Sequence, residues 1–347
     1  MNKINITDLK IGYDIVIVGA GPAGCVFAKT ISKNFSVLMV DSRTIPRDKP
    51  CGGMLVSASK EFLKSFSISE EFTVKPKYLS VTYLDWEKNT KKHEEKNFLN
   101  VDRKKFDYWL FSNIKKPNIS FLQSAKLIEF TYTKNNLISI ILESNGTIKS
   151  VIAKYVIGCD GAISTVRQKL SKKNIPYYLA MQETIQSKKM PKNALFIYDN
   201  SITDFYSWVI PKNNELLIGS ALFPSEAKNK FNILKNKLKE KYGIYGKGSL
   251  KSAIILRPRS INDICLGKKN VFLAGEAAGL ITPTSGEGIS FAMRSGQFAA
   301  EAINNSEEDP LSDYREKCKE LTKVLERKFK KLKNFGIMNW LKAFFNH

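Results

Sequence analysis

The first apolar run of the chain, residues 13–18, is short, nearly continuous and ends at a cluster of glycines. Such a run is typical of a parallel strand that is covered on both faces. Residues 22–33 then have helical spacing with Pro22 at an early helical position, and a second buried-type run, residues 36–40, ends at Asp41. The pattern predicts a strand–helix–strand unit at the start of the chain.

The pattern changes between residues 79 and 161 to strands punctuated by Asn135-Asn136 and Asn145-Gly146. Asn-Gly between two apolar runs is a strong signal for a tight hairpin, so we expect an antiparallel meander here. It ends in residues 155–158, another buried-type strand that should return to the first sheet.

A second antiparallel stretch is expected over residues 176–258. It contains a hairpin over 205–222, with its turn at 212–214, and a helix over 225–241. Residues 270–275 again have the pattern of a strand and lead into a glycine-rich loop, after which residues 285–304 have helical spacing. From residue 311 onward the pattern is that of a Lys-rich helix.

Composition excludes several classes of protein. The 347 residues are 43% hydrophobic, which is enough for a core of roughly two domains. His93 and His347 are the only histidines, so neither a His-based triad nor a His metal site is expected. The five cysteines are scattered without a C-x-x-C pair, which argues against a zinc site or a disulfide framework and for a reducing cytoplasmic location. We therefore expect no metal.

Charge and hydropathy bear on partners and location. Lys and Arg number 55 against 33 Asp and Glu, a net charge of +22. Either an anionic partner or a compositional bias toward Lys, Asn and Ile accounts for this excess, so charge alone identifies no partner, and we expect no nucleic acid. No apolar run approaches the ~18 residues that a membrane span requires, and the first residues lack the apolar core of a signal peptide.

The glycine cluster after the first strand carries the first chemical signal. Residues 19–24 read Gly-Ala-Gly-Pro-Ala-Gly, and Asp41 ends the next strand about 20 residues later. The glycines permit a tight turn and the close approach of a pyrophosphate to a helix N-terminus, and the carboxylate can accept hydrogen bonds from a ribose. The motif predicts a dinucleotide site but does not separate NAD from FAD.

Three further segments resemble a known family. Residues 158–162, Gly-Cys-Asp-Gly-Ala, followed by Ser164 and Arg167, resemble the G-x-D-G-A-x-S-x-x-R segment of FAD-dependent hydroxylase-type flavoproteins. Residues 275–279, with Pro283 and the Ser-Gly-Glu-Gly of 285–288, resemble the segment of that superfamily that holds the ribityl chain and the flavin ring. Glu276 stands where that superfamily usually has Asp.

Within this superfamily the chain resembles the geranylgeranyl reductase branch. The segments concerned are residues 49–53 (Lys-Pro-Cys-Gly-Gly), residues 101–103 (Val-Asp-Arg) with Phe106 and Asp107, and residues 206–208 (Tyr-Ser-Trp) with Pro211. Together the matches span residues 13 to 304.

The resemblance implies an α/β fold with a Rossmann-like FAD-binding domain, an inserted antiparallel β-sheet substrate domain and a C-terminal helix. We expect the FAD-binding domain in residues 1–75, 101–175 (with the meander) and 259–310, the substrate domain in residues 76–100 and 176–258, and a basic amphipathic helix in residues 311–347.

FAD is therefore the expected cofactor. The expected cofactor-binding residues are Gly19, Gly21, Pro22, Ala23, Gly24, Asp41, Ser42, Arg43, Cys51, Gly52, Gly53, Arg103, Asp160, Gly161, Gly275, Glu276, Pro283, Gly286, Glu287, Gly288 and Ile289. The N–H groups of the last four, at a helix start, suit an anionic flavin edge. Arg43 and Arg103 are expected to meet adenosine or pyrophosphate anions, or else to be surface charges.

The expected catalytic residues are Cys51, Tyr206 and Trp208. Cys51 lies in a loop of little bulk where a thiol could approach a flavin, although a free cysteine is often only a small buried hydrophobe. Tyr206 and Trp208 alternate along a strand, so both rings should face the same side, where they either wall an apolar substrate site or fill the core.

The resemblance implies an FAD-dependent reductase of C=C bonds in isoprenoid or other lipid-like substrates, with hydride from flavin N5. The electron donor would be NAD(P)H or a ferredoxin-type protein, which a basic surface would suit. An FAD-dependent monooxygenase or halogenase is the alternative, because residues 206–211 also resemble a halogenase segment. A non-catalytic flavin electron carrier is a second alternative.

The tail holds ten Lys and Arg against four Asp and Glu from residue 312 on. Apolar residues of the tail recur at helical spacing: Leu321, Val324, Leu325, Phe329, Leu332 and Phe335. A second apolar group follows: Ile337, Met338, Trp340, Leu341, Phe344 and Phe345. Two interpretations stay open: peripheral association with an anionic membrane at its inner face, or packing over the FAD-binding domain.

Overall fold

The computed structural model describes residues 1–66, 70–171, 173–306 and 308–345, with side chains described through residue 332. The chain divides into two compact units, each assembled from separate segments. Unit 1 comprises Met1–Arg47, Asp107–Ile175 and Pro258–Arg327, and unit 2 comprises Asp48–Phe106, Pro176–Arg257 and Lys328–His347. The chain therefore crosses between the units several times.

Unit 1 is built on a largely parallel sheet. The order along its main path is β1 (Asn2–Lys3), β7 (Ile119–Gln123), β3 (Val37–Asp41), β2 (Gly12–Val18), β10 (Thr147–Gly158), β17 (Val271–Leu273) and β16 (Gly267–Lys268), and along this path only the last pair is antiparallel. Ile15, Val16 and Ile17 of β2 are fully buried, as expected for a strand flanked by β3 and β10. The expected strand–helix–strand start of the chain is confirmed.

The meander is confirmed for β8 (Ala125–Tyr132), β9 (Ile138–Ser144) and β10. Asn136, Asn145 and Gly146 have positive φ in the two turns, which Asn and Gly tolerate best. β10 is long enough to pair with β9 in its first half and with β2 and β17 in its second half, so the meander is continuous with the central sheet.

The expectation of strands alone between residues 79 and 161 was wrong over residues 103–112. These residues form α3 (Arg103–Ser112), and β7 after it joins the parallel sheet. The carboxylate of Asp102 accepts from Lys105 N at 3.0 Å, and its carbonyl oxygen accepts from Phe106 N at 2.8 Å, so Asp102 caps the helix.

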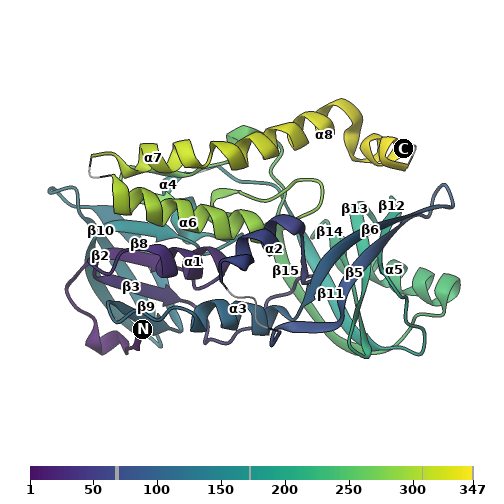
Figure 1. Cartoon of the computed structure of the whole chain (residues 1–347), viewed down its shortest axis with the longest axis horizontal. Helices are drawn as coiled ribbons and strands as arrows, with labels where there is room; N and C mark the ends of the chain where they lie inside the picture. The colour runs from purple at the N-terminus through teal and green to yellow at the C-terminus, as the bar shows by residue number, and fades with distance from the viewer. Residues whose placement is uncertain (67–69, 172, 307, 346–347) are drawn as a thin grey trace. The chain divides into compact units, whose positions relative to one another are not determined.

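Two helices of unit 1 lie side by side, as Figure 1 shows: α1 (Pro22–Thr30) and α6 (Ile289–Asn305). A Cβ on Gly296 would lie 2.2 Å from the carbonyl oxygen of Ala23, so a glycine is required for this close packing. The helix expected over 285–304 begins only at Ile289, because residues 282–287 form a turn of their own. The shorter elements are η1 (Ile6–Asp8), α4 (Thr165–Leu170), η2 (Ile261–Asp263) and η3 (Gly275–Ala278).

The C-terminal helix is in two pieces, α7 (Pro310–Lys317) and α8 (Lys319–Phe345). The Tyr314 hydroxyl donates to the carbonyl oxygen of Leu273 at 2.7 Å, which ties α7 to the sheet of unit 1. Leu321 and Leu325 are also buried, so the beginning of the apolar face of α8 is covered by protein. The expected apolar residues Phe335, Ile337, Met338, Trp340, Leu341, Phe344 and Phe345 lie outside the residues whose side chains are described.

Unit 2 is built on a second, mainly antiparallel sheet. Its order is β15 (Gly248–Leu256), β11 (Tyr177–Gln186), β14 (Glu215–Leu222), β13 (Thr203–Lys212), β12 (Ala194–Asp199), β5 (Thr73–Asp85), β6 (Thr90–Val101) and β4 (Met54–Leu55). The β13–β14 hairpin and α5 (Ala227–Tyr242) confirm the expected hairpin and helix. The remaining helix is α2 (Ser57–Lys64).

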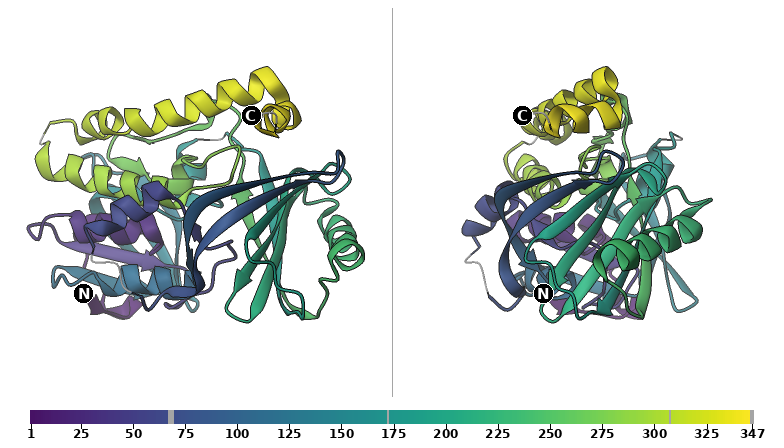
Figure 2. Two further views of the ribbon diagram at one scale, coloured as in Figure 1. Left: turned by 45° about the vertical axis from the view of Figure 1, so that its right-hand side comes forward. Right: turned by 90° about the vertical axis from the view of Figure 1, so that its right-hand side faces the viewer.

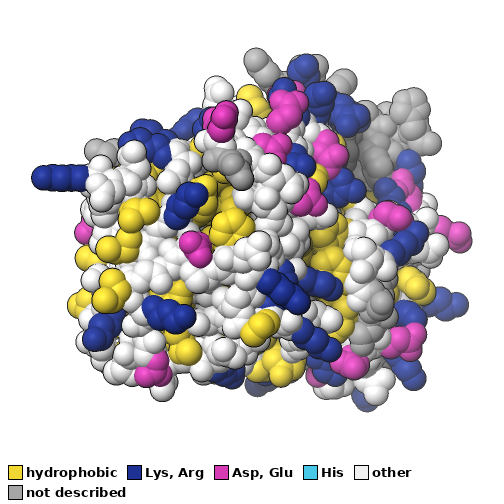
Figure 3. Space-filling view, turned by 60° about the vertical axis from the view of Figure 1, so that its left-hand side comes forward, with side chains coloured by type: hydrophobic (Ala, Val, Ile, Leu, Met, Phe, Trp, Pro, Cys, Tyr) yellow, Lys and Arg dark blue, Asp and Glu magenta, His cyan; other side chains and the backbone are white. Residues whose placement is uncertain are grey.

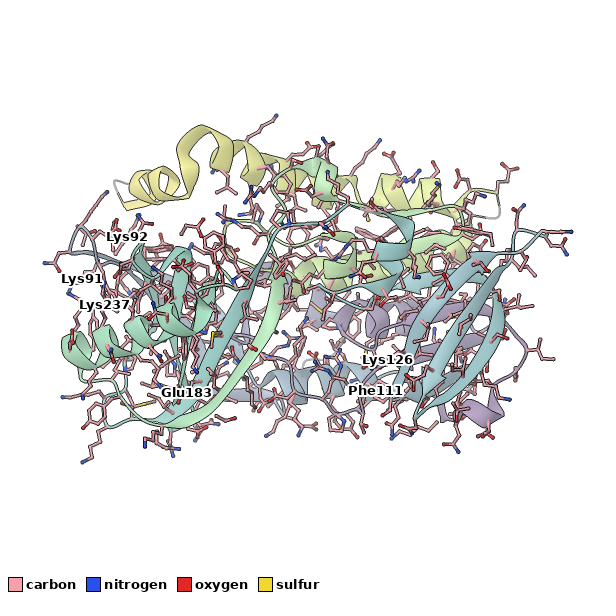
Figure 4. All side chains as sticks on the ribbon, turned by 180° about the vertical axis from the view of Figure 1, so that it is seen from behind. Lys91, Lys92, Phe111, Lys126, Glu183 and Lys237 are labelled. Atoms are coloured by element: carbon pink, nitrogen blue, oxygen red, sulfur yellow. The ribbon has the colours of Figure 1, made fainter. Side chains whose placement is uncertain are left out.

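One face of this sheet is covered by α5, as Figure 2 shows. Phe231, Leu234 and Leu238 of α5 are buried in an aliphatic core. Two lysines of α5 reach buried carboxylates of the sheet at 2.6 Å, Lys235 to Glu183 and Lys237 to Asp199. Glu183 and Lys237 are labelled in Figure 4.

The unit boundaries differ from the expected domain boundaries at three places, one of which is the C-terminal boundary, found after Arg327 and expected after residue 310. Residues 48–75 belong to unit 2, because β4 pairs with β6 and Gly53 O accepts from Val101 N at 2.8 Å. The start of α3 also belongs to unit 2, up to Phe106. The later boundaries, after Ile175 and after Arg257, lie within a residue of those expected.

On the face that Figure 3 shows, Lys and Arg side chains outnumber Asp and Glu, and both kinds are scattered among uncharged side chains. That face carries no single basic patch. Among the helices of the described residues, none is long and apolar enough to cross a bilayer.

Candidate functional site

Two glycines of the first loop are required by the backbone around them. Gly19 has a φ of +106°, and a Cβ there would lie 2.4 Å from the carbonyl oxygen of Cys159. A Cβ on Gly24 would lie 2.0 Å from the carbonyl oxygen of Gly19. Both glycines therefore allow β2, α1 and the end of β10 to pack closely.

Gly21 differs from these two glycines because little of the protein crowds it. A Cβ there would meet only the end of the Arg47 side chain, at 3.3 Å. The N–H groups of Gly21 and Ala23, with Pro22 between them at the start of α1, have no acceptor among the described residues. This leaves space and two N–H donors for a ligand with anionic oxygens.

Asp41 at the end of β3 braces this loop. One carboxylate oxygen accepts from Ala20 N at 2.8 Å, and the other accepts from Arg43 N at 2.9 Å. Arg47 Nε lies 3.4 Å from the first of these oxygens. Arg47 was not among the expected site residues, although a basic residue six positions after Asp41 was a visible signal. Ser42 and Arg43 are exposed beside it.

The second loop is clamped by Arg167. Its guanidinium donates to the carbonyl oxygens of Ala162, at 2.5 Å, and Ala277, at 3.0 Å. This joins the loop around Gly161, which follows β10, to η3, where Gly275 and Glu276 lie. Asp160 Oδ2 accepts from Val166 N at 3.2 Å, whereas the buried Oδ1 has no partner in the described structure. Burial raises the pKa of Asp160.

The turn before α6 leaves fewer free donors than expected. Gly286 N and Glu287 N donate to the carbonyl and the hydroxyl of Thr282, each at 3.0 Å. The Glu287 side chain accepts from Ser290 N at 2.9 Å and so caps α6. Of the four expected N–H groups, only those of Gly288 and Ile289 lack a partner among the described residues. Pro283, which lies in the same turn, is buried.

These features of unit 1 fit an FAD molecule. The open space at Gly21 and the N–H donors of α1 suit a pyrophosphate, and the unpartnered Oδ1 of Asp160 suits a hydroxyl of the ribityl chain. The N–H groups of Gly288 and Ile289 suit a flavin carbonyl. When bound, FAD supplies the two-electron chemistry that none of these side chains can perform.

A second group of expected residues lies in unit 2, around Cys51. The Cys51 thiol accepts from Gly53 N at 3.4 Å. Burial opposes ionisation of this thiol, but the Arg103 guanidinium, the Gly53 N–H and Lys49 outweigh it and lower the pKa of Cys51. Arg103, expected at the adenosine or pyrophosphate, is instead buried beside Cys51.

Lys212 holds the loop of Cys51, Gly52 and Gly53 in place. Its ammonium donates to Asn100 Oδ1 at 2.5 Å, to Val101 O at 2.9 Å and to Gly53 O at 3.3 Å. A Cβ on Gly53 would lie 2.3 Å from Val101 O, so this glycine is required. Burial lowers the pKa of Lys212 to about 7, although Cys51 and Asp102 oppose this. Lys212 was not among the expected site residues, although it follows Pro211 directly.

Tyr206 and Trp208 of β13 face the same side of the unit 2 sheet, and their rings meet edge to face at 5.9 Å. Burial raises the pKa of Tyr206, and the nearby Cys51 adds to this effect. Other rings on this face are those of Tyr83, Tyr178, Phe196, Tyr198 and Phe205. In the part of the chain that the structure describes, no group of three His, Cys, Asp or Glu residues could hold a metal ion.

Comparison with known proteins supports the cofactor directly. Residues 12–189 match the model of the family described as FAD binding domain. The protein CbrA of Escherichia coli is 30% identical over 294 residues, which are 82% of this chain and 82% of CbrA.

Two solved structures share the fold. A geranylgeranyl bacteriochlorophyll reductase-like protein from Thermoplasma acidophilum aligns with a TM-score of 0.78 and 21% identity, over 95% of this chain and 86% of that one. The flavin-dependent brominase Bmp2 aligns with a TM-score of 0.73 and 18% identity, over 95% and 89%. This chain thus binds FAD, is an FAD-dependent oxidoreductase, and belongs to the FAD binding domain family.

Proposed function

We propose that this protein is an FAD-dependent reductase of C=C bonds in a long isoprenoid chain. The observation that carries the proposal is the combination, within unit 2, of a thiol of lowered pKa with an extended aromatic face. Cys51 lies close enough to Tyr206 to raise the pKa of its hydroxyl, and Tyr206 packs against Trp208 at 5.9 Å. An apolar polyene suits such a face, and the reaction needs an acid there.

Reduction of a C=C bond requires a hydride, which reduced FAD supplies, and a proton for the other carbon. Cys51 is the proposed proton donor, because Arg103 stabilises its thiolate and so makes the thiol a stronger acid. Tyr206 is the weaker candidate, since burial raises the pKa of its hydroxyl. Lys212 fixes the loop that presents Cys51 through its bond to Gly53 O.

The aromatic face supports an apolar substrate. Tyr83, Phe196, Tyr198, Tyr206 and Trp208 contact one another in pairs, with ring centroids 5.0 to 6.4 Å apart. Such rings bind a flexible hydrocarbon by burying its surface. As electron source we propose NAD(P)H or a small ferredoxin-type protein, and as the route to a lipid substrate a peripheral contact with an anionic membrane.

Turnover under nitrogen tests the proposal. FAD-loaded protein, dithionite and geranylgeraniol should give a product with two more hydrogens for each bond reduced, identified by mass spectrometry. Cys51→Ala should retain FAD but lose roughly 100-fold in rate, the usual contribution of a general acid. A product that contains added oxygen or halogen and forms only in air would show an oxygen-using enzyme instead.

A further inference from the structure

Two buried polar groups on the aromatic face of unit 2 have no partner. The indole Nε1 of Trp208 and the amide Oε1 of Gln182 are both buried without a hydrogen bond to any described residue. Each residue is only 7% exposed. Native proteins rarely leave buried donors and acceptors unpaired, because each costs free energy comparable to a lost hydrogen bond.

The strand register puts these two groups on the same face, on either side of a glycine. Gln182 of β11 pairs with Gly219 of β14, and Gly219 pairs with Trp208 of β13. Directly paired residues of neighbouring strands point to the same side of a sheet. These paired residues form a row across the sheet, which continues from Trp208 through Phe196 of β12 to Tyr83 of β5.

The indole ring reaches across the glycine toward the strand of Gln182. A Cβ on Gly219 would lie 2.3 Å from Cε2 and 2.4 Å from Nε1 of Trp208. The ring of a β13 residue therefore lies on β14, and the next strand beyond it is β11. A side chain at position 219 would overlap the indole ring, so only a glycine leaves room for the ring there.

We propose that Gln182 and Trp208 form a hydroxyl-binding subsite, in which the indole N–H donates to a substrate oxygen and the amide oxygen accepts its proton. This inference rests on the proposed function and specifies its substrate as a prenyl alcohol. An alcohol provides both an acceptor and a donor on one atom, so it satisfies both groups. A pure hydrocarbon would leave both unpaired in the complex.

The composition of the row supports this orientation of the substrate. Phe196 and Tyr83 lie beyond Trp208 on one side, whereas on the other side Gln182 pairs with Lys251 of the edge strand β15. The Lys251 side chain is 48% exposed and forms an ion pair with Asp48. The row thus changes from aromatic to polar toward the sheet edge, as a substrate with an apolar chain and a polar end requires.

The test compares three probes by equilibrium dialysis against the full-length, FAD-loaded protein: geranylgeraniol, its methyl ether, and the corresponding hydrocarbon. The methyl ether can accept a hydrogen bond but cannot donate one. We expect the alcohol to bind roughly tenfold more tightly than the ether, and the ether more tightly than the hydrocarbon.

Two substitutions test which side chain accepts and which donates the hydrogen bond. Gln182→Met should abolish the preference for alcohol over ether, and Trp208→Phe should abolish the preference for ether over hydrocarbon. Gln186→Met on the same strand, whose side chain is exposed, is the matched control and should keep both preferences. The wild-type comparison needs no substitution, so a variant that fails to fold does not prevent the test.

Equal binding of all three probes by the wild-type protein would overturn the subsite and indicate a buried water between the two groups, while the prenyl substrate class would stand. An unchanged alcohol preference in folded Gln182→Met would also overturn it. Failure of all three probes to bind would overturn the proposed substrate class together with the subsite.

Discussion

The three glycines of the first loop in unit 1 have different roles: two are required by the fold, and one leaves space for a ligand. Gly19 and Gly24 are required by neighbouring carbonyl oxygens 2.0 to 2.4 Å from the Cβ positions, whereas Gly21 has only the Arg47 side chain near it. Gly21→Val should therefore leave the protein folded but lower FAD content roughly tenfold or more, because the side chain fills the pyrophosphate space.

The flavin absorbance of the purified variant measures this effect. Gly12→Val is the matched control, because Gly12 is exposed at the start of β2 and a Cβ there has its nearest neighbour 3.9 Å away. Normal FAD content in the Gly21 variant would contradict this position for the pyrophosphate.

Arg103 is the main group that lowers the pKa of Cys51. Removing the guanidinium removes the main group that stabilises the thiolate, so Arg103→Gln should raise the pKa of Cys51. At neutral pH the variant thiol should react with iodoacetamide about tenfold more slowly for each unit by which the pKa rises. Peptide mass spectrometry follows Cys51 separately from the buried thiols of Cys25, Cys159 and Cys318.

Lys104→Gln is the control for this experiment, since Lys104 is the next residue in α3 and is exposed. An Arg103 variant with the wild-type pH profile of alkylation would show that the guanidinium does not act on the thiol.

At the scale of elements, α5 is held to the sheet of unit 2 by ion pairs as well as by its apolar face. Burial raises the pKa of Asp199, but the bonds from Lys237 and Ser201 outweigh this and lower it. A carboxyl whose pKa is depressed on folding contributes stability above its unfolded pKa of about 3.9 and loses it as the pH falls through the folded value.

Lys237→Met should therefore lower the free energy of unfolding by about 1 kcal/mol near neutral pH. The loss is modest because the lysine is partly exposed to solvent. The difference from wild type should shrink as the pH falls below about 4, where Asp199 becomes protonated in the unfolded chain. Urea unfolding at two pH values measures it, with the exposed Lys239→Met as control. A pH-independent difference would point to lost packing instead.

Elements with a strong local pattern could be predicted from the sequence. The buried strands around Ile17 and Val156, and the hairpins at Asn145-Gly146 and Asn213, have signals that lie within a few residues. α3 was missed although Asp102 is a good N-cap and Phe106, Trp109 and Leu110 have helical spacing.

The residues of the candidate site that belong to a sequence motif could be predicted. Those that act through contacts between distant parts of the chain could not. Gly19, Asp41 and Asp160 lie in recognisable loops. Lys212 meets Gly53 and Asn100 across more than 100 residues, and such a contact leaves no local pattern. The pairing of Gln182 with Trp208 across Gly219 depends on strand register, which the sequence alone does not define.

At the scale of the whole molecule, the first part of the C-terminal helix α8 is packed against the protein. Leu321, Leu325 and Phe329 of α8 are buried, so truncation after Asn334 removes none of these packed side chains. We expect the truncated protein to keep its FAD and its turnover of a short, water-soluble prenyl alcohol. It should lose cosedimentation with phosphatidylglycerol vesicles at low salt, because the removed segment carries aromatic residues suited to a membrane interface.

High salt should weaken vesicle binding of the full-length protein, since the charges of the tail are screened. Loss of FAD or precipitation on truncation would make the segment part of the core. Unchanged vesicle binding would assign any membrane contact to another surface.

We propose that reduced FAD in this protein passes its electrons to a C=C bond. A single turnover without air tests this. The bound FAD is reduced photochemically and geranylgeraniol is added. Flavin absorbance at about 450 nm is then followed, and the mass of the product is determined by mass spectrometry. We predict that the oxidised flavin spectrum returns at the rate at which a dihydro product appears. Flavin that stays reduced until oxygen is admitted, with no change in the mass of the prenyl alcohol, would contradict the claim.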